Sequence, residues 1–526
     1  MKRTILILIA VVTIINYSCD KEDLLDQPIQ GRQQLDDFFA SQANVENFVN
    51  GIYKKVNGES WWQVNFQRQI NEMATDDNWA GNTRQPRPDI FGIAQYNVFP
   101  GSTYFNSFWE SHYIGITRAN IALDRIPGVE IPDEKRSQYL GEAKFLRAFF
   151  YFDLVRNFGG VPIVTSYNEI LEPTINDKER SSVEEVYELI EADLLQAIDA
   201  LPLRSQYAAS DLGRATKGAA QSLLAKVYLT EEKWAEAQTM AKSVMDSGEY
   251  SLEQDFADIY KVGNPHGVES IFEVEYINDP SFSEIGGQFS ITNGSRGDRG
   301  WGWCTPSSDL ENAFLSEGDE VRLRSTIIKH GEEVFGDPEV EAFDAVPSEN
   351  KSGRTNRKYY VPTADRPEPY QRGQIPLSYI HLRLADVILM HAEASFFVGD
   401  EASAKNSIRM IRDRVNLDTN MSLSGSALRD AIWKERRLEL ALEQHRLYDL
   451  RRQKIGGVPR IALILGPNGS WVKYNTEVST DPFETTNLLE SQDSGKLFNP
   501  NIHLLWPIPP EEIQLSRGKI VQNPGY

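Results

Sequence analysis

Cys19 is the residue whose chemistry the surrounding sequence defines best. It follows a basic start, Lys2-Arg3, and an apolar run from Ile5 to Ile15, with Ser18 as the small residue directly before it. This order is typical of a secretory signal, and the run is too short to cross a bilayer, which takes about 20 apolar residues. A cysteine thiol at the first position after the cut is the group that is acylated in bacterial lipoproteins. The sequence therefore predicts a signal peptide at residues 1–18 and a lipid on Cys19.

The residues before the cysteine leave a second interpretation open. Lipoprotein signals usually carry Leu three positions before the Cys, where this chain has Asn16, and the bulky Tyr17 follows it. An ordinary signal peptide that is cut near a cysteine also fits this pattern. The lipid interpretation has physical support, because several acyl chains that each contribute about 0.8 kcal/mol per buried methylene hold a protein durably. We expect residues 19–33 to form the lipidated N-terminus and a polar tether.

The other reactive residue types form no catalytic or metal-binding motif. The 7 His residues are scattered, without an HExxH pattern or a Cys/His cluster at metal-ligand spacing. A GxSxG elbow, a Walker A loop and a convincing GxGxxG are also missing. Acidic pairs are uninformative in a chain with 76 Asp and Glu residues. These absences favour binding over catalysis, and we predict neither an enzyme activity nor a cofactor or metal.

The composition argues against nucleic acid as a partner and allows a large core. A formal net charge of -22 opposes binding to a polyanion, which needs a basic face. Cys304 is the only other cysteine, so the exported chain has no disulfide framework if Cys19 is lipidated. With 40% hydrophobic and 10% aromatic residues, the chain can rely on a hydrophobic core instead.

Helices are the elements that the sequence predicts for most of the chain. Residues 181–201 form one candidate helix, with Ser181 or Ser182 as its N-cap. Helical hairpins follow at residues 215–252 and 380–415, where small Ala residues alternate with larger apolar ones at spacings of three and four. A further, highly charged helix is predicted at about 428–452. Helix pairs joined by tight turns are typical of tetratricopeptide-type repeats, so we expect a mainly α fold.

The stretch between the two hairpins, residues 255–378, has a different character. Gly, Pro, Ser and Asn are frequent there, and short β-like runs such as 271–274 appear. Irregular stretches of this length inside a compact domain are usually functional. We therefore divide the mature chain into an N-terminal helical region, 34–252, and a C-terminal region, 253–526, that contains the irregular insertion.

Several segments, in order along the chain, resemble the SusD/RagB family of outer-membrane nutrient-binding lipoproteins. These segments are Lys21-Glu22-Asp23 with Leu24-Leu25-Asp26-Gln27-Pro28, Glu142 to Ala148, Phe158 to Pro162, Thr216 to Leu252, Leu382 to Ala394, Glu435-Arg436-Arg437, Arg446 to Arg452, Pro507-Ile508-Pro509 and Gln522 to Tyr526. The resemblance therefore covers essentially the whole mature chain. One departure is Gln444-His445 after Glu443, where the family more often has a Gly; we place these residues within the charged helix.

The resemblance implies a mainly α-helical fold of tetratricopeptide-like helix pairs, an α-α superhelix, whose irregular, loop-rich part faces a ligand. It implies a lipoprotein that is anchored in the outer membrane and faces the cell exterior, and the acidic run after Cys19 resembles a surface-export tag. It also implies a partner, a SusC-like TonB-dependent transporter that the lipoprotein covers as a lid. The implied function is the capture of oligosaccharides for that transporter, with peptides, as in the RagB branch, as the alternative ligand.

Family members that bind glycans use aromatic side chains on loops, helped by a few polar ones. Asn78 and Trp79 precede a polar loop, where a Trp is poorly explained by core packing. Trp301 and Trp303 are two residues apart, so both rings point to the same side of an extended segment, and we expect one of them to face the ligand. Arg299 can pair with an acidic sugar or a peptide carboxylate, or it can form an internal ion pair.

Charged residues on the C-terminal helices invite a catalytic interpretation, but we predict that they form structural ion pairs between packed helices. They are Glu393, Glu435, Arg437, Glu439, Arg446, Asp449 and Arg451. A glycoside hydrolase, one alternative function, needs two carboxylates that face each other across a cleft. A scaffold that binds only protein, another alternative, would lack an exposed aromatic cluster.

Overall fold

The computed structural model describes most of the chain after residue 37. The described residues are 38–57, 64–81, 88–172, 174–276, 288–294, 300–329, 331–332, 352–366, 375–481 and 497–526. Cys19, the signal peptide, the tether and Arg299 lie outside them, so the statements about these residues stay predictions. Helices make up most of the described residues, and the mainly α fold expected from the sequence is confirmed.

The N-terminal region consists of helices that follow the apolar periodicity of the sequence. They are α4 (Gln42–Asn57), α5 (Val64–Glu72), α6 (Pro88–Gln95), α7 (Thr103–Arg125), α8 (Asp133–Phe158), α9 (Tyr167–Leu171), α10 (Val183–Ala200), α11 (Lys217–Thr230) and α12 (Trp234–Met245). Short 3-10 turns connect some of them: η1 (Ile126–Gly128), η2 (Ile175–Asp177), η3 (Arg204–Gln206) and η4 (Ala209–Asp211). The helix predicted at residues 181–201 is α10. Its N-cap is Ser182, whose hydroxyl accepts a hydrogen bond from the Glu185 N–H (3.1 Å), while the Glu185 carboxylate accepts one from the Ser182 N–H (2.7 Å).

The two predicted hairpins are present and pack against each other. The first is α11 with α12, and the second is α16 (Leu384–Phe397) with α17 (Glu401–Arg414). Helices α7, α8, α10, α11, α12, α16 and α17 pack in this order, each against the next, as a superhelix of antiparallel helices requires. Because α12 contacts α16 directly, the residues between them leave the helical stack and return to it.

The charged helix predicted at about 428–452 is instead two helices. They are α18 (Gly425–Glu439) and α19 (Arg446–Arg452), and the chain turns between them. Leu442 and Gln444 both have a φ of 65°, a left-handed conformation that cannot continue an α-helix and that favours Gly. Our placement of Gln444-His445 within one helix was therefore wrong, and the Gly that the family often has there fits the observed turn. The C-terminal part continues with α20 (Arg460–Leu465), α21 (Ser470–Lys473), the π-helical turn η8 (Tyr474–Val478) and α23 (Pro510–Leu515).

The stretch between α12 and α16 contains short helices and strands, which the described residues show in part. The helices are η5 (Phe256–Tyr260), α13 (Gln288–Asn293), α14 (Ser308–Glu317), α15 (Glu320–Thr326) and η7 (Thr363–Asp365). The strands in this stretch are β2 (Ser270–Val274), β3 (Trp303–Pro306), β4 (Ile327–Lys329), β5 (Arg354–Asn356) and β6 (Tyr379–Arg383), and those outside it are β1 (Asn78–Gly81), β7 (Lys454–Ile455) and β8 (Val458–Pro459). They form four antiparallel pairs among the described residues: β1 with β3, β2 with β6, β4 with β5 and β7 with β8. The β-like run predicted at 271–274 is β2.

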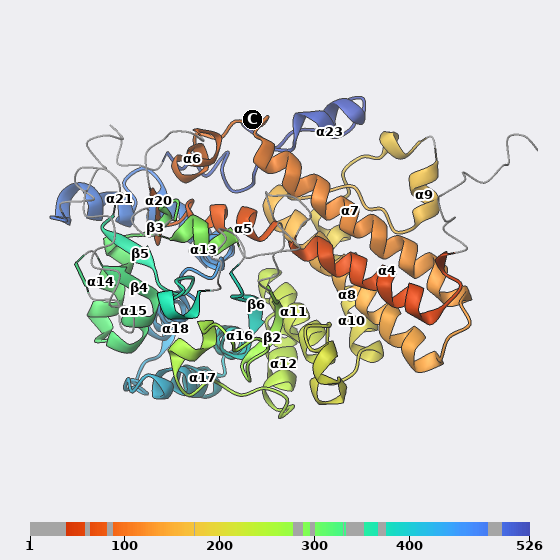
Figure 1. Ribbon diagram of the computed structural model, residues 1–526. Coiled ribbons are helices and arrows are strands. Elements are labelled where there is room, and N and C mark those ends of the chain that lie inside the picture. Colours follow the sequence, from red (N-terminus) through yellow and green to blue (C-terminus); the bar gives the residue numbers. More distant parts are fainter. Residues whose placement is uncertain are drawn as a thin grey trace, which may run out of the picture.

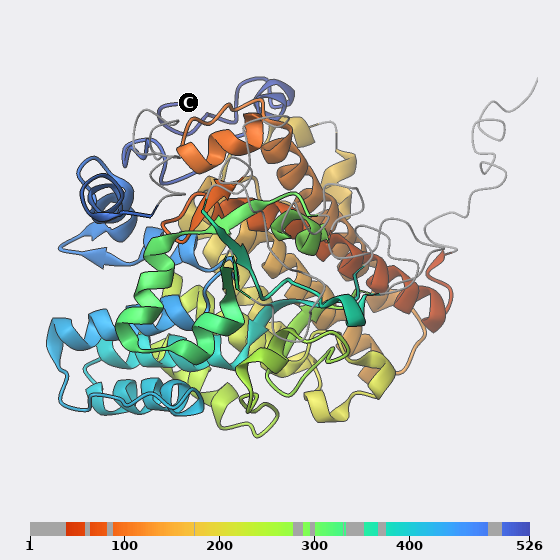
Figure 2. The ribbon, with the colours of Figure 1, turned by 60° about the vertical axis from the view of Figure 1, so that its left-hand side comes forward.

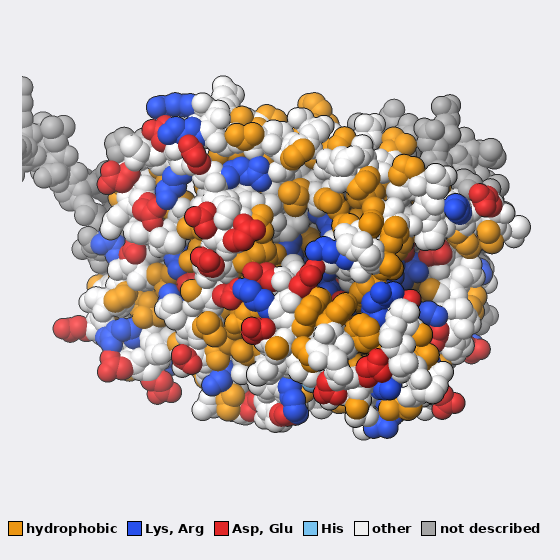
Figure 3. All heavy atoms as spheres, turned by 180° about the vertical axis from the view of Figure 1, so that it is seen from behind, with side chains coloured by type: hydrophobic (Ala, Val, Ile, Leu, Met, Phe, Trp, Pro, Cys, Tyr) orange, Lys and Arg blue, Asp and Glu red, His pale blue; other side chains and the backbone are white. Residues whose placement is uncertain are grey.

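The helical and loop-rich parts occupy different sides of the molecule. In Figure 1, the N-terminal helices α4, α7, α8, α9 and α10 lie on the right, and β3, β4, β5, α14 and α15 lie on the left together with α20 and α21. After a 60° turn, the green strands and short helices lie in front of the N-terminal helices (Figure 2). On the face seen from behind, acidic and basic side chains are interspersed and a hollow lies near the centre (Figure 3). One large hydrophobic core extends through the helices and reaches β1 and β3.

Candidate ligand-binding face

The short β1–β3 ladder brings the predicted aromatic residues together. Trp79 lies in β1 opposite Thr305, and Trp303 lies in β3 opposite Gly81. Gly81 has a φ of 91°, and a Cβ added to it would lie 2.0 Å from the carbonyl oxygen of Gly302. Only a glycine therefore allows the two strands to approach so closely at this end of the ladder.

The structure places Trp79 in the hydrophobic core, which differs from our expectation of a loop side chain that faces a ligand. Its side chain is 7% exposed, and its ring centroid lies 4.9 Å from that of Trp471. The pairing of β1 with β3 draws the residue inward, and α21 supplies the ring that covers it. Asn78 is also buried, at 1% exposure. Neither side chain presents an accessible surface to a ligand in this arrangement.

Trp301 and Trp303 lie side by side and form an aromatic cluster with Phe91. Their ring centroids are 5.0 Å apart, in agreement with the expectation that both rings point the same way. Trp303 is 5% exposed and packs edge-on against Phe91 (5.8 Å), whereas Trp301 is half-buried. Of the predicted tryptophans, Trp301 is therefore the one with ring surface left for a ligand.

The backbone around Trp301 is fixed by the end of α13. The Trp301 N–H donates to the carbonyl oxygen of Ile291 (2.7 Å), and the Gly302 N–H donates to that of Gly294 (2.8 Å). A Cβ on Gly300 would lie 2.0 Å from the Gly294 carbonyl oxygen, so this approach also needs a glycine. A ring held by such a rigid segment can stack on a ligand with little loss of side-chain entropy.

Asp76 and Asp77, which precede β1, pair with arginines of the C-terminal helices. Arg446 binds Asp76 through two hydrogen bonds (Nε to Oδ1, 2.9 Å; Nη2 to Oδ2, 2.7 Å). Arg437 binds Asp77 through Nε (2.7 Å) and reaches Asp309 on α14 through Nη2 (2.6 Å). These contacts join the start of β1 and α14 to α18 and α19. They therefore fix the β1–β3 ladder, which carries the candidate face, to the C-terminal helices.

Burial strongly perturbs the carboxylates beneath this face. Burial alone would raise the pKa of Asp76, but Arg437 and Arg446 hold it well below its usual range. Glu72 lies beside Asp77 instead, and burial together with that second carboxylate raises its pKa to about 8. Glu72 is therefore largely protonated at neutral pH, which reduces the cost of its burial, although the nearby Arg446 partly opposes this shift of its pKa.

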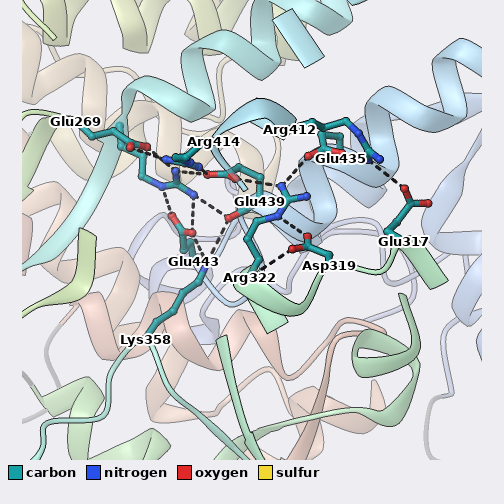
Figure 4. A network of polar contacts seen from close by, with 11 residues as sticks. Glu269, Glu317, Asp319, Arg322, Lys358, Arg412, Arg414, Glu435, Glu439 and Glu443 are labelled. Carbon is teal, nitrogen blue, oxygen red and sulfur yellow. Dashed lines mark hydrogen bonds and ion pairs between the residues drawn. The ribbon is translucent and has the colours of Figure 1, made fainter. Parts of the chain in front are cut away.

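A network of buried charges joins the irregular stretch to the C-terminal helices (Figure 4). Its members are Glu269, Glu317, Asp319, Arg322, Lys358, Arg383, Arg412, Arg414, Glu435, Glu439 and Glu443. Glu439 lies at its centre and contacts Arg383 (2.6 Å), Arg322 (3.1 Å) and Arg414. The side chains of Glu439 and Arg322 are 0% exposed. The prediction that Glu435 and Glu439 are structural is confirmed.

The other predicted structural charges are also engaged. Arg437 pairs with Asp77, Arg446 with Asp76, Asp449 with Arg436 (2.7 Å) and Glu393 with Arg452 (2.7 Å). Arg451 differs, because it makes no ion pair within the described part of the chain. Its Nη2 donates to the His503 carbonyl (3.2 Å), and its guanidinium lies 4.6 Å from the Trp506 ring centroid. Its role is therefore cation–π packing of the C-terminal segment.

The arginine-paired carboxylates at the helical junction hold elements of the fold together. The carboxylates that meet at the helical junction are held by arginines and lie in the interior. Among the described residues, no three His, Cys, Asp or Glu side chains are grouped as a metal ion would require. The sequence interpretation missed Trp471, which packs on Trp79, and Phe91, which packs on Trp303. Their contacts come from residues far along the chain, so no local pattern marked them.

Comparison with known families gives two matches in sequence order. Residues 23–229 match a family described as starch-binding and associating with the outer membrane. Residues 268–526 match the SusD family. Together the two matches cover most of the chain.

Individual relatives extend over nearly the whole chain. The chain is 27% identical to a SusD-like protein, P2, of Formosa agariphila, over 100% of both chains, and 23% identical to a SusD-like protein of Bacteroides ovatus, over 84% of this chain and 81% of that protein. Among solved structures, it resembles a laminarin-binding SusD-like protein with a TM-score of 0.75 and 27% identity, over 93% of this chain and 100% of the other. It also resembles a SusD homologue from Bacteroides thetaiotaomicron with a TM-score of 0.75 and 26% identity, over 94% and 99% of the two chains.

Proposed function

We propose, from the premise that this chain belongs to the SusD/RagB family, that it is a cell-surface lipoprotein that binds an oligosaccharide and delivers it to a SusC-like TonB-dependent transporter. The observation that carries the proposal is the pair of family matches, which follow each other along residues 23–229 and 268–526. The likeness to a solved laminarin-binding protein over 93% of the chain supports a glycan as the ligand.

The proposed contact residue for the glycan is Trp301. Its half-buried ring lies beside the buried ring of Trp303, so it offers a flat apolar surface at the edge of the aromatic cluster. Such a ring suits the C–H face of a sugar, while polar neighbours are needed for the hydroxyl groups. Trp303 would support this ring, whereas Asn78 is buried at the other end of the β1–β3 ladder. Arg299 remains a candidate polar partner outside the described residues.

The proposed anchor is a lipid on Cys19, followed by the tether up to residue 33. Among the described residues, no helix combines the length and the apolar character needed to cross a membrane. We retain the division into regions 34–252 and 253–526, and we propose binding without catalysis, cofactor or metal. A Cys19→Ser variant tests the anchor by membrane fractionation in cells that lack the transporter. A variant that stays firmly bound to the membrane there would exclude the lipid.

Binding measurements on the purified protein test the ligand class. We expect laminarin or soluble starch to bind in isothermal titration calorimetry and a mixture of short peptides not to bind. Trp301→Ala should weaken the glycan at least tenfold, a change of about 1.4 kcal/mol. Trp234→Ala is the matched control, because Trp234 is also half-buried but packs on Phe397 of α16, away from the candidate face (ring centroids 4.1 Å apart).

Two results would contradict the proposal. Peptide binding without glycan binding would assign the protein to the alternative, a peptide-binding member of the same family. Equal affinity in Trp301→Ala and the parent, with both proteins folded by circular dichroism, would remove Trp301 from the site.

A further inference from the structure

A cleft of about 280 Å³ lies between the first half of α7, the segment 162–178 and the C-terminal segment 509–520. In Figure 1, α7, α9 and α23 lie at the upper right, whereas β3, β5 and α14 lie on the left. The cleft is lined by no residue of β1 or β3, so it is separate from the candidate ligand-binding face.

Hydrogen bonds hold the walls of the cleft together. The Tyr113 hydroxyl donates to the carbonyl oxygen of Pro162 (2.8 Å), and the Lys178 ammonium donates to that of Ile163 (2.8 Å). Trp109 on α7 and Glu512 on α23 both line the cleft, so its wall includes both helices. A cleft whose walls are fixed in this way is formed before a ligand arrives, which lowers the entropy cost of binding.

Two aromatic rings, one helical turn apart on α7, form the floor. The ring centroids of Trp109 and Tyr113 are 5.1 Å apart. Trp109 is 2% exposed and packs edge-on against Phe158, so its role is mainly support. Tyr113 is half-buried and lines the cleft, and its ring offers a flat surface for the C–H face of a sugar.

Unused hydrogen-bonding groups stand on both sides of these rings. Glu110 on α7 and Asn176 on η2 are exposed and line the cleft. In the part of the chain that the structure describes, no hydrogen bond or ion pair engages either side chain. An amide both donates and accepts, and a carboxylate accepts from neighbouring hydroxyls, which are the functions that a sugar ring needs.

The carboxylate of Glu512 makes the cleft unfavourable for a negatively charged ligand. Burial raises the pKa of this half-buried carboxylate, and the neighbouring carboxylates Glu511 and Glu110 raise it further. A ligand that donates hydrogen bonds relieves this burial, whereas a ligand with a negative charge adds to the repulsion. The cleft therefore favours hydroxyl donors over an acidic ligand such as a uronic acid or a sulfated sugar.

We propose that this cleft is a second sugar-binding site, which takes one neutral pyranose unit on the Tyr113 ring with Glu110, Asn176 and Glu512 as hydrogen-bonding partners. The inference rests on the proposed function, since it assigns the same class of ligand to a second place on the chain. Two sites on one molecule raise the apparent affinity for a polymer that reaches both of them, without strengthening either contact.

The test combines a double variant of exposed cleft residues with a matched control. In the intact protein, Glu110→Gln with Asn176→Ala should weaken the binding of laminarin or soluble starch about three- to tenfold in calorimetry. The control pair, Glu188→Gln with Asn501→Ala, also changes exposed residues and should leave the affinity unchanged. Hydrogen exchange should slow in peptides from residues 103–125 and 509–520 when glycan saturates the parent protein, and not in the double variant.

The outcomes separate this inference from the proposed function. Suppose that the parent binds glycan and that Trp301→Ala abolishes all binding. If the double variant then keeps the affinity of the parent, and glycan does not slow hydrogen exchange at the cleft, the second site is overturned while the proposed function stands. If the parent binds no glycan, both are overturned. Residual glycan binding in Trp301→Ala that the double variant removes would support the second site.

Discussion

The charge network around Glu439 and the aromatic cluster around Trp303 are both buried, but different forces hold them together. The network depends on paired charges at fixed geometry, because each desolvated carboxylate needs its arginine. The cluster depends on close packing of rings, which has no fixed donor or acceptor and tolerates a partly exposed member such as Trp301. The network therefore positions the loop-bearing elements on the helices, and the cluster leaves a ring at its edge for binding.

Glu439→Ala should have the largest effect on stability. Removing this carboxylate takes one ion-pair partner from each of the buried residues Arg322, Arg383 and Arg414, and breaking a buried pair typically costs about 3–5 kcal/mol. The measurement is the free energy of unfolding from urea titration. Glu320→Ala, which removes an exposed pair with Arg324 (3.4 Å), is the control and should change it by less than about 0.5 kcal/mol. Similar losses of unfolding free energy in the two variants would show that the buried ion pairs of Glu439 contribute no more to stability than an exposed pair.

Trp303→Ala and Trp301→Ala should show that Trp303 mainly stabilises the fold and that Trp301 mainly contacts the ligand. Truncating the buried Trp303 should cost about 3–5 kcal/mol, because it leaves a cavity beside Phe91. Trp301→Ala should cost about 1–2 kcal/mol, since part of its ring already faces solvent. The two unfolding free energies, measured beside glycan affinity, check the comparison. A larger stability loss in Trp301→Ala than in Trp303→Ala would reverse our assignment of the two rings.

Acid should weaken the network through Glu443. Burial alone would raise the pKa of this carboxyl, but Arg383 and Lys358 lower it from 4.5 to about 2. A lowered pKa gives stability that is complete above about pH 4.5 and is lost as the pH falls towards 2, in total about 3 kcal/mol. The slope of unfolding free energy against pH should therefore be steeper in the parent than in Glu443→Gln between these values. Equal slopes would mean that Glu443 titrates normally in the folded state.

Lys358 gives the same network a second pH dependence, of the same sign but at alkaline pH. Burial lowers the pKa of its ammonium from 10.5 to about 8, and Glu443 opposes that shift only in part. A lowered pKa in a base costs stability below about pH 8, and this cost disappears as the pH rises towards 10.5. The two groups are 2.5 Å apart, and in the folded protein both are charged between about pH 2 and about pH 8.

The sequence predicted those elements whose signals are local. The helix α10 with its Ser182 cap and the hairpin α11–α12 follow from periodicity and capping alone. The break between α18 and α19 does not, because Gln444 occupies a left-handed conformation without being a Gly. Trp79 was misplaced because its burial depends on β3 and Trp471, which lie far along the chain. The Trp109–Tyr113 pair has the spacing of a core helix face, so no sequence pattern marked the cleft.

The ion pair between Lys242 and Asp246 on α12 should have the smallest effect, and it isolates the role of burial. Its Nζ–Oδ2 distance of 2.6 Å equals that of Arg383 to Glu439, but its side chains are 59% and 61% exposed. Water already solvates both charges, so Lys242→Ala should change the free energy of unfolding by less than about 0.5 kcal/mol. A loss above about 2 kcal/mol in the same urea titration would mean that contact distance sets the strength of these pairs. Burial would then not explain the large effect expected for Glu439→Ala.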